Sequence, residues 1–265
     1  MPTIDLSEYL CIHYEEANPG GVPPVLLLHG LGSAGGDWLF QLEALAEAGY
    51  RALAPDLRGF GRSTAPPRVT VKDMAEDMAL FLRRLDAAPA HVVGISMGGT
   101  VALQLALDHP TLVRKLVLVN TFARLRPRSI SEWLYFLSRM VTVTFLSPEQ
   151  QAEMVAKRIF PRPEQEGLRK KLYRRIVNAN PYAYRAAMSS LRRFNVVERL
   201  GELRIPTLVV TGSEDTTIPP VAQEELARSI PNARHAIVEG GGHAVIADSP
   251  EAFNRILLEF LKDAD

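Results

Sequence analysis

Short runs of β-branched residues and leucine recur along the chain with no polar alternation. Runs of this length predict strands that are buried on both faces. They lie at residues 25–28, 52–54, 91–95, 116–119, 207–210 and 235–238. Two earlier segments, near 3–6 and 9–15, have no helix between them and predict a β-hairpin.

Segments with helical periodicity separate these runs. They cover roughly 38–48, 71–86, 98–108, 220–229 and 250–263. Strands that alternate with helices predict a mostly parallel sheet covered by helices on both faces. Ligands bind such sheets at the carboxyl ends of the strands, so the chemistry is expected there.

Residues 121–200 break this rhythm, because no buried-strand run appears in them. This stretch holds 16 Lys or Arg against 6 Asp or Glu, and 10 of the 19 aromatic residues. The remainder holds 14 basic residues against 24 acidic ones, so residues 121–200 carry a net charge of +10 and the remainder a net charge of −10. We predict a helical insertion over the carboxyl edge of the sheet. Its charge is either a solvated surface that complements the acidic remainder or a lid that attracts anionic substrates.

Composition narrows the class of protein only in part. The 265 residues suit one large domain or one domain with an insertion. The formal charge of zero points to neither nucleic acid nor an acidic membrane as partner. Cys11 is the only cysteine, which excludes an intrachain disulfide and a multi-cysteine metal site. The sequence has no run of about 18 apolar residues and no signal-peptide pattern, so the prediction is a cytoplasmic protein without a membrane span.

The segment Gly94-Ile95-Ser96-Met97-Gly98 fits the pattern G-x-S-x-G. Its context is more informative than the pattern, because it follows a Val/Ile strand and opens an Ala/Leu helix. A nucleophilic serine at a sharp strand-to-helix turn requires this setting. The glycines leave room for the turn, and the helix start offers free amides against a developing oxyanion. We therefore predict Ser96 as a nucleophile.

Acyl transfer also needs two backbone N–H groups that point at the oxyanion. One is expected from Met97, the residue after the nucleophile. The other is expected from the loop His29-Gly30-Leu31-Gly32-Ser33 after the strand at 25–28, with Leu31 as the candidate. His29 is a rival for the role of catalytic base, but we expect it to hold this loop by hydrogen bonds.

His243 is the predicted general base. It ends Glu239-Gly240-Gly241-Gly242-His243, just past the last predicted strand, on a loop that glycine leaves free to bend. A base must reach the serine and then serve leaving group and water in turn. The other four histidines, at positions 13, 91, 109 and 235, do not fall at the carboxyl end of a predicted strand.

The acid partner of the histidine should follow the strand at 207–210, where Glu214 and Asp215 are neighbours. Only one of these carboxylates can face the imidazole. The pattern Asp215-Thr216-Thr217-Ile218-Pro219 favours Asp215 over Glu214. Its role would be to fix the imidazole tautomer and to stabilise the imidazolium.

These motifs together resemble the α/β-hydrolase fold over nearly the whole chain, including the order Ser, Asp, His. The turn Asp56-Leu57-Arg58-Gly59-Phe60-Gly61-Arg62-Ser63 fits the family too, where it is structural, and Asp56 and Arg58 are expected to lock loops. The resemblance implies an α/β fold with a mostly parallel eight-stranded sheet and helices on both faces. It divides the chain into a core of residues 1–122 and 201–265 and a helical cap of residues 123–200.

More narrowly, the chain resembles bacterial carboxylesterases and 3-oxoadipate enol-lactonase-like proteins. It departs from haloalkane dehalogenases and epoxide hydrolases, whose nucleophile is aspartate. It also lacks the oxyanion loop of many C–C hydrolases, since Gly32 is followed by Ser33-Ala34-Gly35. The prediction is a carboxylic-ester hydrolase without metal or organic cofactor, acting on a small ester or lactone. Enol-lactonase, C–C hydrolase and perhydrolase activity, or ligand binding without turnover, remain alternatives.

Overall fold

The computed structural model describes residues 2–125, 130, 133–134, 137–138, 142 and 146–263. Within them, eight strands form one sheet in the order β1-β2-β4-β3-β5-β6-β7-β8. β1 and β2 form the predicted antiparallel hairpin, β2 pairs antiparallel with β4, and every other pairing is parallel. The strands are β1 (Thr3–Ser7), β2 (Leu10–Ala17), β3 (Pro24–Leu28), β4 (Arg51–Pro55), β5 (Ala90–Ile95), β6 (Val113–Val119), β7 (Thr207–Gly212) and β8 (Arg234–Val238).

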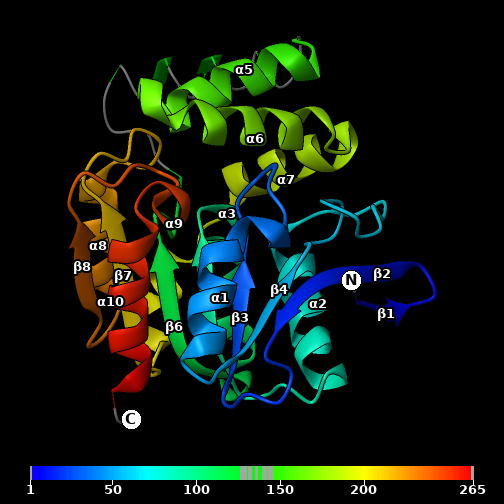
Figure 1. Ribbon diagram of the computed structural model, residues 1–265, viewed down its shortest axis with the longest axis vertical. Helices are drawn as coiled ribbons and strands as arrows, with labels where there is room; N and C mark the ends of the chain where they lie inside the picture. Colours follow the sequence, from blue (N-terminus) through cyan, green and yellow to red (C-terminus); the bar gives the residue numbers. More distant parts are fainter. Residues whose placement is uncertain are drawn as a thin grey trace.

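The central strands are buried on both faces, as their unbroken apolar runs predict. Alternate side chains of β3 divide between two apolar clusters, Leu26 and Leu28 in one, Val25 and Leu27 in the other. The first cluster includes residues of α2 (Val71–Arg84), α3 (Met97–Asp108) and α8 (Pro220–Ser229). The second includes residues of α1 (Leu39–Glu47), α9 (Val245–Asp248) and α10 (Pro250–Lys262). The sheet is thus the middle of three layers (Figure 1).

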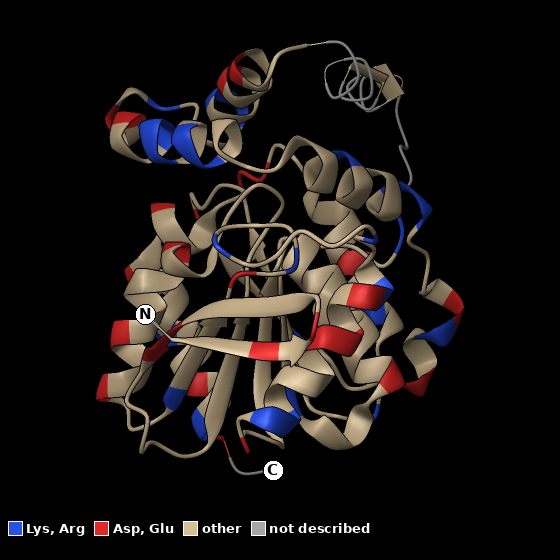
Figure 2. Cartoon of the chain, turned by 90° about the vertical axis from the view of Figure 1, so that its right-hand side faces the viewer, with Lys and Arg blue, Asp and Glu red and all other residues tan. Residues whose placement is uncertain are grey.

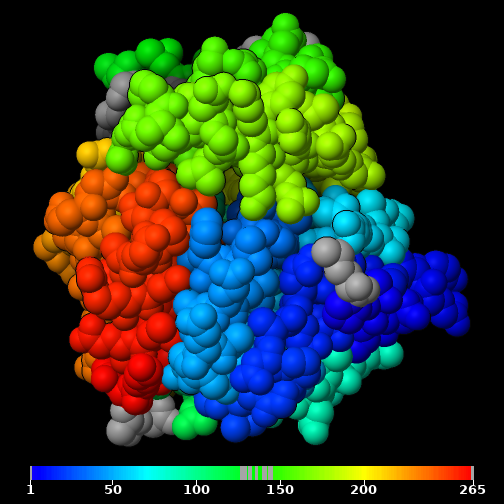
Figure 3. All heavy atoms as spheres, in the orientation of Figure 1, coloured from blue at the N-terminus to red at the C-terminus, as the bar shows by residue number. Residues whose placement is uncertain are grey.

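Among the described residues, the α-helices named next follow β6 and precede β7, and we call them the cap helices. They are α5 (Pro148–Ile159), α6 (Glu166–Val177) and α7 (Pro181–Arg193). Figure 1 shows them above the carboxyl ends of the strands, and Figure 3 shows them seated on the core. Four 3₁₀ helices complete the described elements, η1 (Gly35–Trp38), η2 (Pro110–Leu112), η3 (Pro163–Gln165) and η4 (Val197–Glu202).

Part of the predicted cap, residues 123–200, lies outside the described residues. The positions concerned are 126–129, 131–132, 135–136, 139–141 and 143–145. The described part of the cap contacts the core through polar bonds. The Tyr182 hydroxyl donates to the Pro67 carbonyl at 2.6 Å, and the Val71 amide donates to Ser190 Oγ at 2.9 Å. None of the described helices is long and apolar enough to cross a membrane.

Candidate active site

Ser96 occupies a sharp turn between β5 and α3. Its backbone has φ 53° and ψ −115°, a conformation that is strained for a residue with a side chain. The turn is tight enough to require its two glycines. A Cβ on Gly94 would lie 2.3 Å from the Gly98 carbonyl oxygen, and a Cβ on Gly98 would lie 2.0 Å from that of Leu28. This is the strand–turn–helix geometry that the motif predicts for Ser96.

Asp215 and His243 form a buried pair. Asp215 follows β7, and its carboxylate oxygens lie 2.9 and 3.0 Å from His243 Nδ1. The Thr217 and Ile218 amides donate to the same carboxylate at 2.7 and 3.0 Å, which fixes its orientation. Because Nδ1 faces a carboxylate, it carries the proton, and Nε2 is left as the acceptor. His243 and Ser96 line the same cavity.

Glu214 lies differently from its neighbour. Its side chain is 60% exposed and pairs with Arg162 at 3.1 Å. Its carboxylate therefore faces Arg162 and the solvent, and it makes no hydrogen bond to His243 among the described residues. The structure therefore brings Asp215, and not Glu214, to the histidine.

His29 holds the loop after β3. The Leu57 amide donates to its Nε2 at 3.0 Å, so the ring proton sits on Nδ1, which donates to the Gly30 carbonyl at 2.8 Å. Burial lowers the pKa of His29 below its ordinary value of 6.5. With both nitrogens used, His29 has no lone pair for proton transfer. The other four histidines are not among the described residues that line the cavity.

The two predicted oxyanion donors come from two segments next to Ser96. Met97 is the first residue of α3, so its amide has no acceptor within the helix. Leu31 lies in the loop after β3 and lines the cavity. This loop passes close to the nucleophile, because a Cβ on Gly30 would lie 3.6 Å from Ser96 Cβ.

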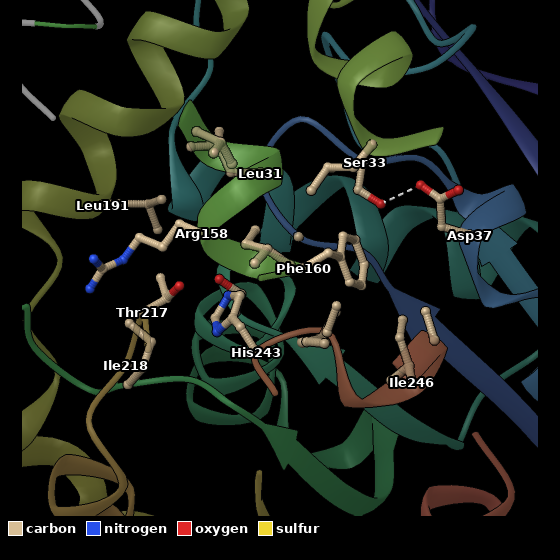
Figure 4. Close-up of a pocket in the computed structure, with 18 of the residues that line it drawn as sticks. Leu31, Ser33, Asp37, Arg158, Phe160, Leu191, Thr217, Ile218, His243 and Ile246 are labelled. Carbon is tan, nitrogen blue, oxygen red and sulfur yellow. Dashed lines mark hydrogen bonds between the residues drawn. The ribbon is translucent and has the colours of Figure 1, made fainter. Parts of the chain in front are cut away.

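Asp37 of η1 fastens the same loop. It accepts from Ser33 Oγ at 2.7 Å and from the Ala34 amide at 3.3 Å (Figure 4). Lys171 and Arg175 of α6 lie 3.1 and 3.4 Å from its other oxygen. Burial opposes ionisation of this carboxyl, but Arg175, the Ser33 hydrogen bond and Lys171 together lower the pKa of Asp37. No motif in the sequence marks Asp37 as part of the site.

The turn at 56–63 locks loops beneath the site, as the resemblance implies. Asp56 accepts from the Gly35 amide at 2.7 Å, and from His13 Nδ1 and the Arg62 amide at 2.9 Å each. Arg58 forms a bidentate pair with Asp77. These contacts hold the start of η1, and with it the loop that carries Leu31.

A cavity of about 430 Å³ lies between the sheet and the cap helices. Most of its lining is apolar, and Figure 4 shows His243 among residues from both parts, such as Ile246 of the core and Leu191 of α7. Four of its described lining residues are charged, Asp37, Arg124, Arg158 and Lys171, and three of these make contacts with other groups of the protein. Lys171 pairs with Asp37, and the Arg158 guanidinium donates to the Thr216 carbonyl. The space beside Ser96 is therefore mainly apolar.

Three further polar residues support the site and were missed by the sequence analysis. Asn120 and Thr121 follow β6, and Gln223 of α8 donates to Asp215 Oδ2 at 3.3 Å. The signal for the first two was available, because they are polar residues directly after a buried strand at the carboxyl edge of the sheet. Gln223 carried no such signal.

The chain belongs to the α/β-hydrolase fold family, whose model matches residues 23–250. It is 34% identical to the "Putative carbamate hydrolase RutD" of Variovorax paradoxus over 94% of this chain and 96% of that protein. A thermophilic esterase from Thermogutta terrifontis has 28% identity and a TM-score of 0.82, over 96% of this chain and 93% of the esterase. The enol-lactonase of Burkholderia xenovorans has 24% identity and a TM-score of 0.89, over 99% and 100%. The last likeness shows the shared fold alone.

Proposed function

We propose that this chain hydrolyses carboxylic esters through an acyl-enzyme intermediate. Ser96 is the nucleophile, His243 the general base and Asp215 the acid partner. The observation that carries the proposal is the Asp215–His243 pair, which leaves His243 Nε2 as an acceptor in the cavity that Ser96 also lines. A serine becomes a nucleophile at neutral pH only when such a base takes its proton.

The proposed reaction has two halves. Ser96 Oγ attacks the ester carbonyl while His243 Nε2 takes its proton, and the Leu31 and Met97 amides stabilise the oxyanion. His243 then gives this proton to the departing alcohol. In the second half His243 activates a water that attacks the acyl-enzyme, and Ser96 regains its proton. No metal or organic cofactor takes part in these steps.

The mainly apolar lining of the cavity supports a substrate with an apolar acyl or alcohol group. The Asp37 carboxylate lies at the wall of the cavity and forms ion pairs with Lys171 and Arg175. A second carboxylate on the substrate would have to compete with it. We propose residues 123–200 as a cap over the core of residues 1–122 and 201–265, with the cap helices forming one wall of this cavity. A cytoplasmic location remains a prediction.

Hydrolysis of p-nitrophenyl acetate, butyrate and octanoate tests the proposal directly. We expect turnover by the wild type, and loss of about 10⁴-fold or more in kcat for Ser96→Ala, because the nucleophile acts as a unit with its base. Ser229→Ala is the matched control, since the Ser229 hydroxyl donates to the Glu225 carbonyl on the exposed side of α8. Wild-type inactivity on every ester and lactone tried, or an undiminished Ser96→Ala rate, would overturn the proposal.

Carbamate hydrolysis is the second candidate, because the relative at 34% identity is described as a carbamate hydrolase. The same residues would attack a carbamate carbonyl. Nitrogen donation makes a carbamoyl-enzyme slower to hydrolyse than an acyl-enzyme, so an esterase should release one equivalent of p-nitrophenol from p-nitrophenyl N-methylcarbamate and then stall. Steady turnover of the carbamate at a rate comparable to the butyrate would favour the second candidate.

A further inference from the structure

Asn120 and Thr121 lie between the two strands that carry the nucleophile and the acid. They directly follow β6, which pairs with β5 on one side and β7 on the other. Both side chains are completely buried. A buried polar side chain must find hydrogen-bond partners, and those of Asn120 and Thr121 bind the backbone of the site itself.

Thr121 contacts the nucleophile turn. Its Oγ1 donates to the Ser96 carbonyl at 2.7 Å, and the Ser96 amide donates to the Val119 carbonyl at 2.9 Å. The first turn of α3 packs against the same side chain, since a Cβ on Gly99 would lie 2.5 Å from Thr121 Cβ. The strained backbone of Ser96 is therefore held from β6 on both of its sides.

Asn120 contacts the loop of the base and the strand of the acid. Its Nδ2 donates to the Gly242 and His243 carbonyls at 2.9 and 2.7 Å. Its Oδ1 accepts from the Gly212 amide at 2.8 Å, at the end of β7. A single amide thus ties the carbonyl of His243 to the strand that precedes Asp215.

We propose that Asn120 and Thr121 are positioning residues that hold His243 in register with Ser96. The inference rests on the proposed function. His243 follows three consecutive glycines, and glycine has the least constrained backbone of all residues. A general base must nevertheless stay within hydrogen-bond reach of the serine, so the loop that carries His243 needs to be held in place. Asn120 fixes the loop, Thr121 fixes the turn, and the peptide between them joins the two.

Thr121→Val tests the half that acts on Ser96, because it removes the hydroxyl and keeps the shape. The Ser96 carbonyl retains the Gly99 and Thr100 amides at 3.0 and 3.2 Å, so the fold should survive. We expect kcat for p-nitrophenyl butyrate and the rate of Ser96 labelling by a fluorophosphonate each to fall about tenfold, with KM within twofold. Thr121→Ser should restore both. Thr207→Val is the matched control, a buried hydroxyl that donates to the Ile205 carbonyl at 3.0 Å at the opposite end of the sheet.

Asn120→Gly tests the half that acts on His243. Asn120 has φ 45°, which glycine adopts without strain, so the substitution removes the three side-chain bonds and little else. Asn232→Gly is the control, since Asn232 has φ 58° in an exposed turn. We expect kcat to fall by about 10- to 100-fold for Asn120→Gly and to stay within twofold for the control. The rate of Ser96 labelling by a fluorophosphonate should fall by a similar factor, because this reaction also needs His243 to take the proton of Ser96.

The two proposals fail in different ways. A wild type that turns over no ester and takes no fluorophosphonate would overturn both. An active wild type whose Thr121→Val and Asn120→Gly variants match their controls in kcat and labelling rate would overturn only the positioning role. So would a Thr121→Ser variant that is as slow as Thr121→Val. Thermal unfolding of every variant separates a lost fold from lost positioning, and if Asn120→Gly does not fold, the Thr121 pair decides.

Discussion

Glu214 and Asp215 are adjacent in sequence and opposite in environment. Asp215 is buried and receives four donor groups, from Thr217, Ile218, Gln223 and His243. Glu214 is mostly exposed beside Arg162. The two neighbouring side chains thus point in different directions, one into the site and the other to the solvent. Substituting each of them separately will therefore show which one is the acid partner of His243.

Asp215→Asn should lower kcat for p-nitrophenyl butyrate by roughly 10³- to 10⁴-fold, because an amide that donates to Nδ1 imposes the wrong tautomer on His243. Glu214→Gln should stay within about twofold, since an exposed ion pair contributes little. Steady-state kinetics of the two variants at one pH suffices. Comparable losses in both, or a larger loss in Glu214→Gln, would contradict the assignment of Asp215.

His29 links the site to the pH dependence of folding. Since burial lowers its pKa, the unfolded chain binds a proton at a pH where the folded chain does not. The contribution of His29 is therefore complete above pH 6.5 and is lost as the pH falls below it. The melting-temperature gap between wild type and His29→Gln should narrow from pH 7 to pH 5, measured by circular dichroism. A gap that is constant or wider at pH 5 would refute this role.

The motif residues were predictable from the sequence, whereas the contacts that their supporting residues make were not. Ser96 and His243 follow strand signals and sit among glycines, which local pattern can detect. Gln223 lies within a helix, and its role in the site arises only because the fold brings the Asp215 carboxylate next to it. Asn120 depends on carbonyl groups of a loop far along the chain, and no local pattern encodes that convergence.

At the scale of elements, the side chain of Asp37 connects α6 to the loop after β3. Asp37 binds Ser33 and Ala34 in that loop, and Lys171 and Arg175 on α6. It joins the cap to the segment that offers the Leu31 amide. The two sets of contacts differ in burial, because Lys171 is 50% exposed and Asp37 is 17% exposed.

Asp37→Asn should therefore reduce kcat more than the double variant Lys171→Gln with Arg175→Gln. We expect about a three- to tenfold loss for Asp37→Asn, through the loop and its oxyanion donor, and less than twofold for the double variant, whose ion pairs are partly solvated. Rates with p-nitrophenyl butyrate give the comparison. Equal losses would instead assign the effect to the cap.

The strands of the core were predicted within one to three residues, because burial on both faces leaves an unbroken apolar run in the central strands. The prediction that the strand at 235–238 is also buried on both faces was wrong, because β8 is an edge strand in which Ile237 is 52% exposed. The helix expected over 38–48 divides into η1, which ends at Trp38, and α1, which begins at Leu39. Trp38 is fully buried, so tertiary packing sets this boundary rather than helical periodicity. The arrangement of α5, α6 and α7 was beyond local pattern, because their seat on the core depends on contacts such as that of Tyr182 with Pro67.

At the scale of the whole molecule, opposite charges are segregated along the chain but interleaved in space. Basic residues colour much of the helices at the top of Figure 2. Several basic residues of the stretch 123–200 pair with acidic residues of the core, as in Lys171 with Asp37, Arg162 with Glu214, and Arg199 with Asp108. The excess of basic residues in the cap therefore complements the acidic core, which is the first of the two interpretations of this charge.

This arrangement predicts a weak effect of salt. The Debye length falls from about 10 Å at 0.1 M to about 3 Å at 1 M, so salt weakens long-range attraction of an anion to exposed cations. We expect kcat/KM for p-nitrophenyl butyrate and for its carboxylate analogue mono-p-nitrophenyl succinate to change less than about twofold between roughly 0.05 and 0.5 M NaCl. The butyrate should be the better substrate, because most of the cavity lining is apolar and a carboxylate would lose its hydration there. A succinate ester that is preferred at low salt and declines steeply with added salt would instead identify the cap as a lid that attracts anions, and would favour a carboxylate-bearing lactone as the natural substrate.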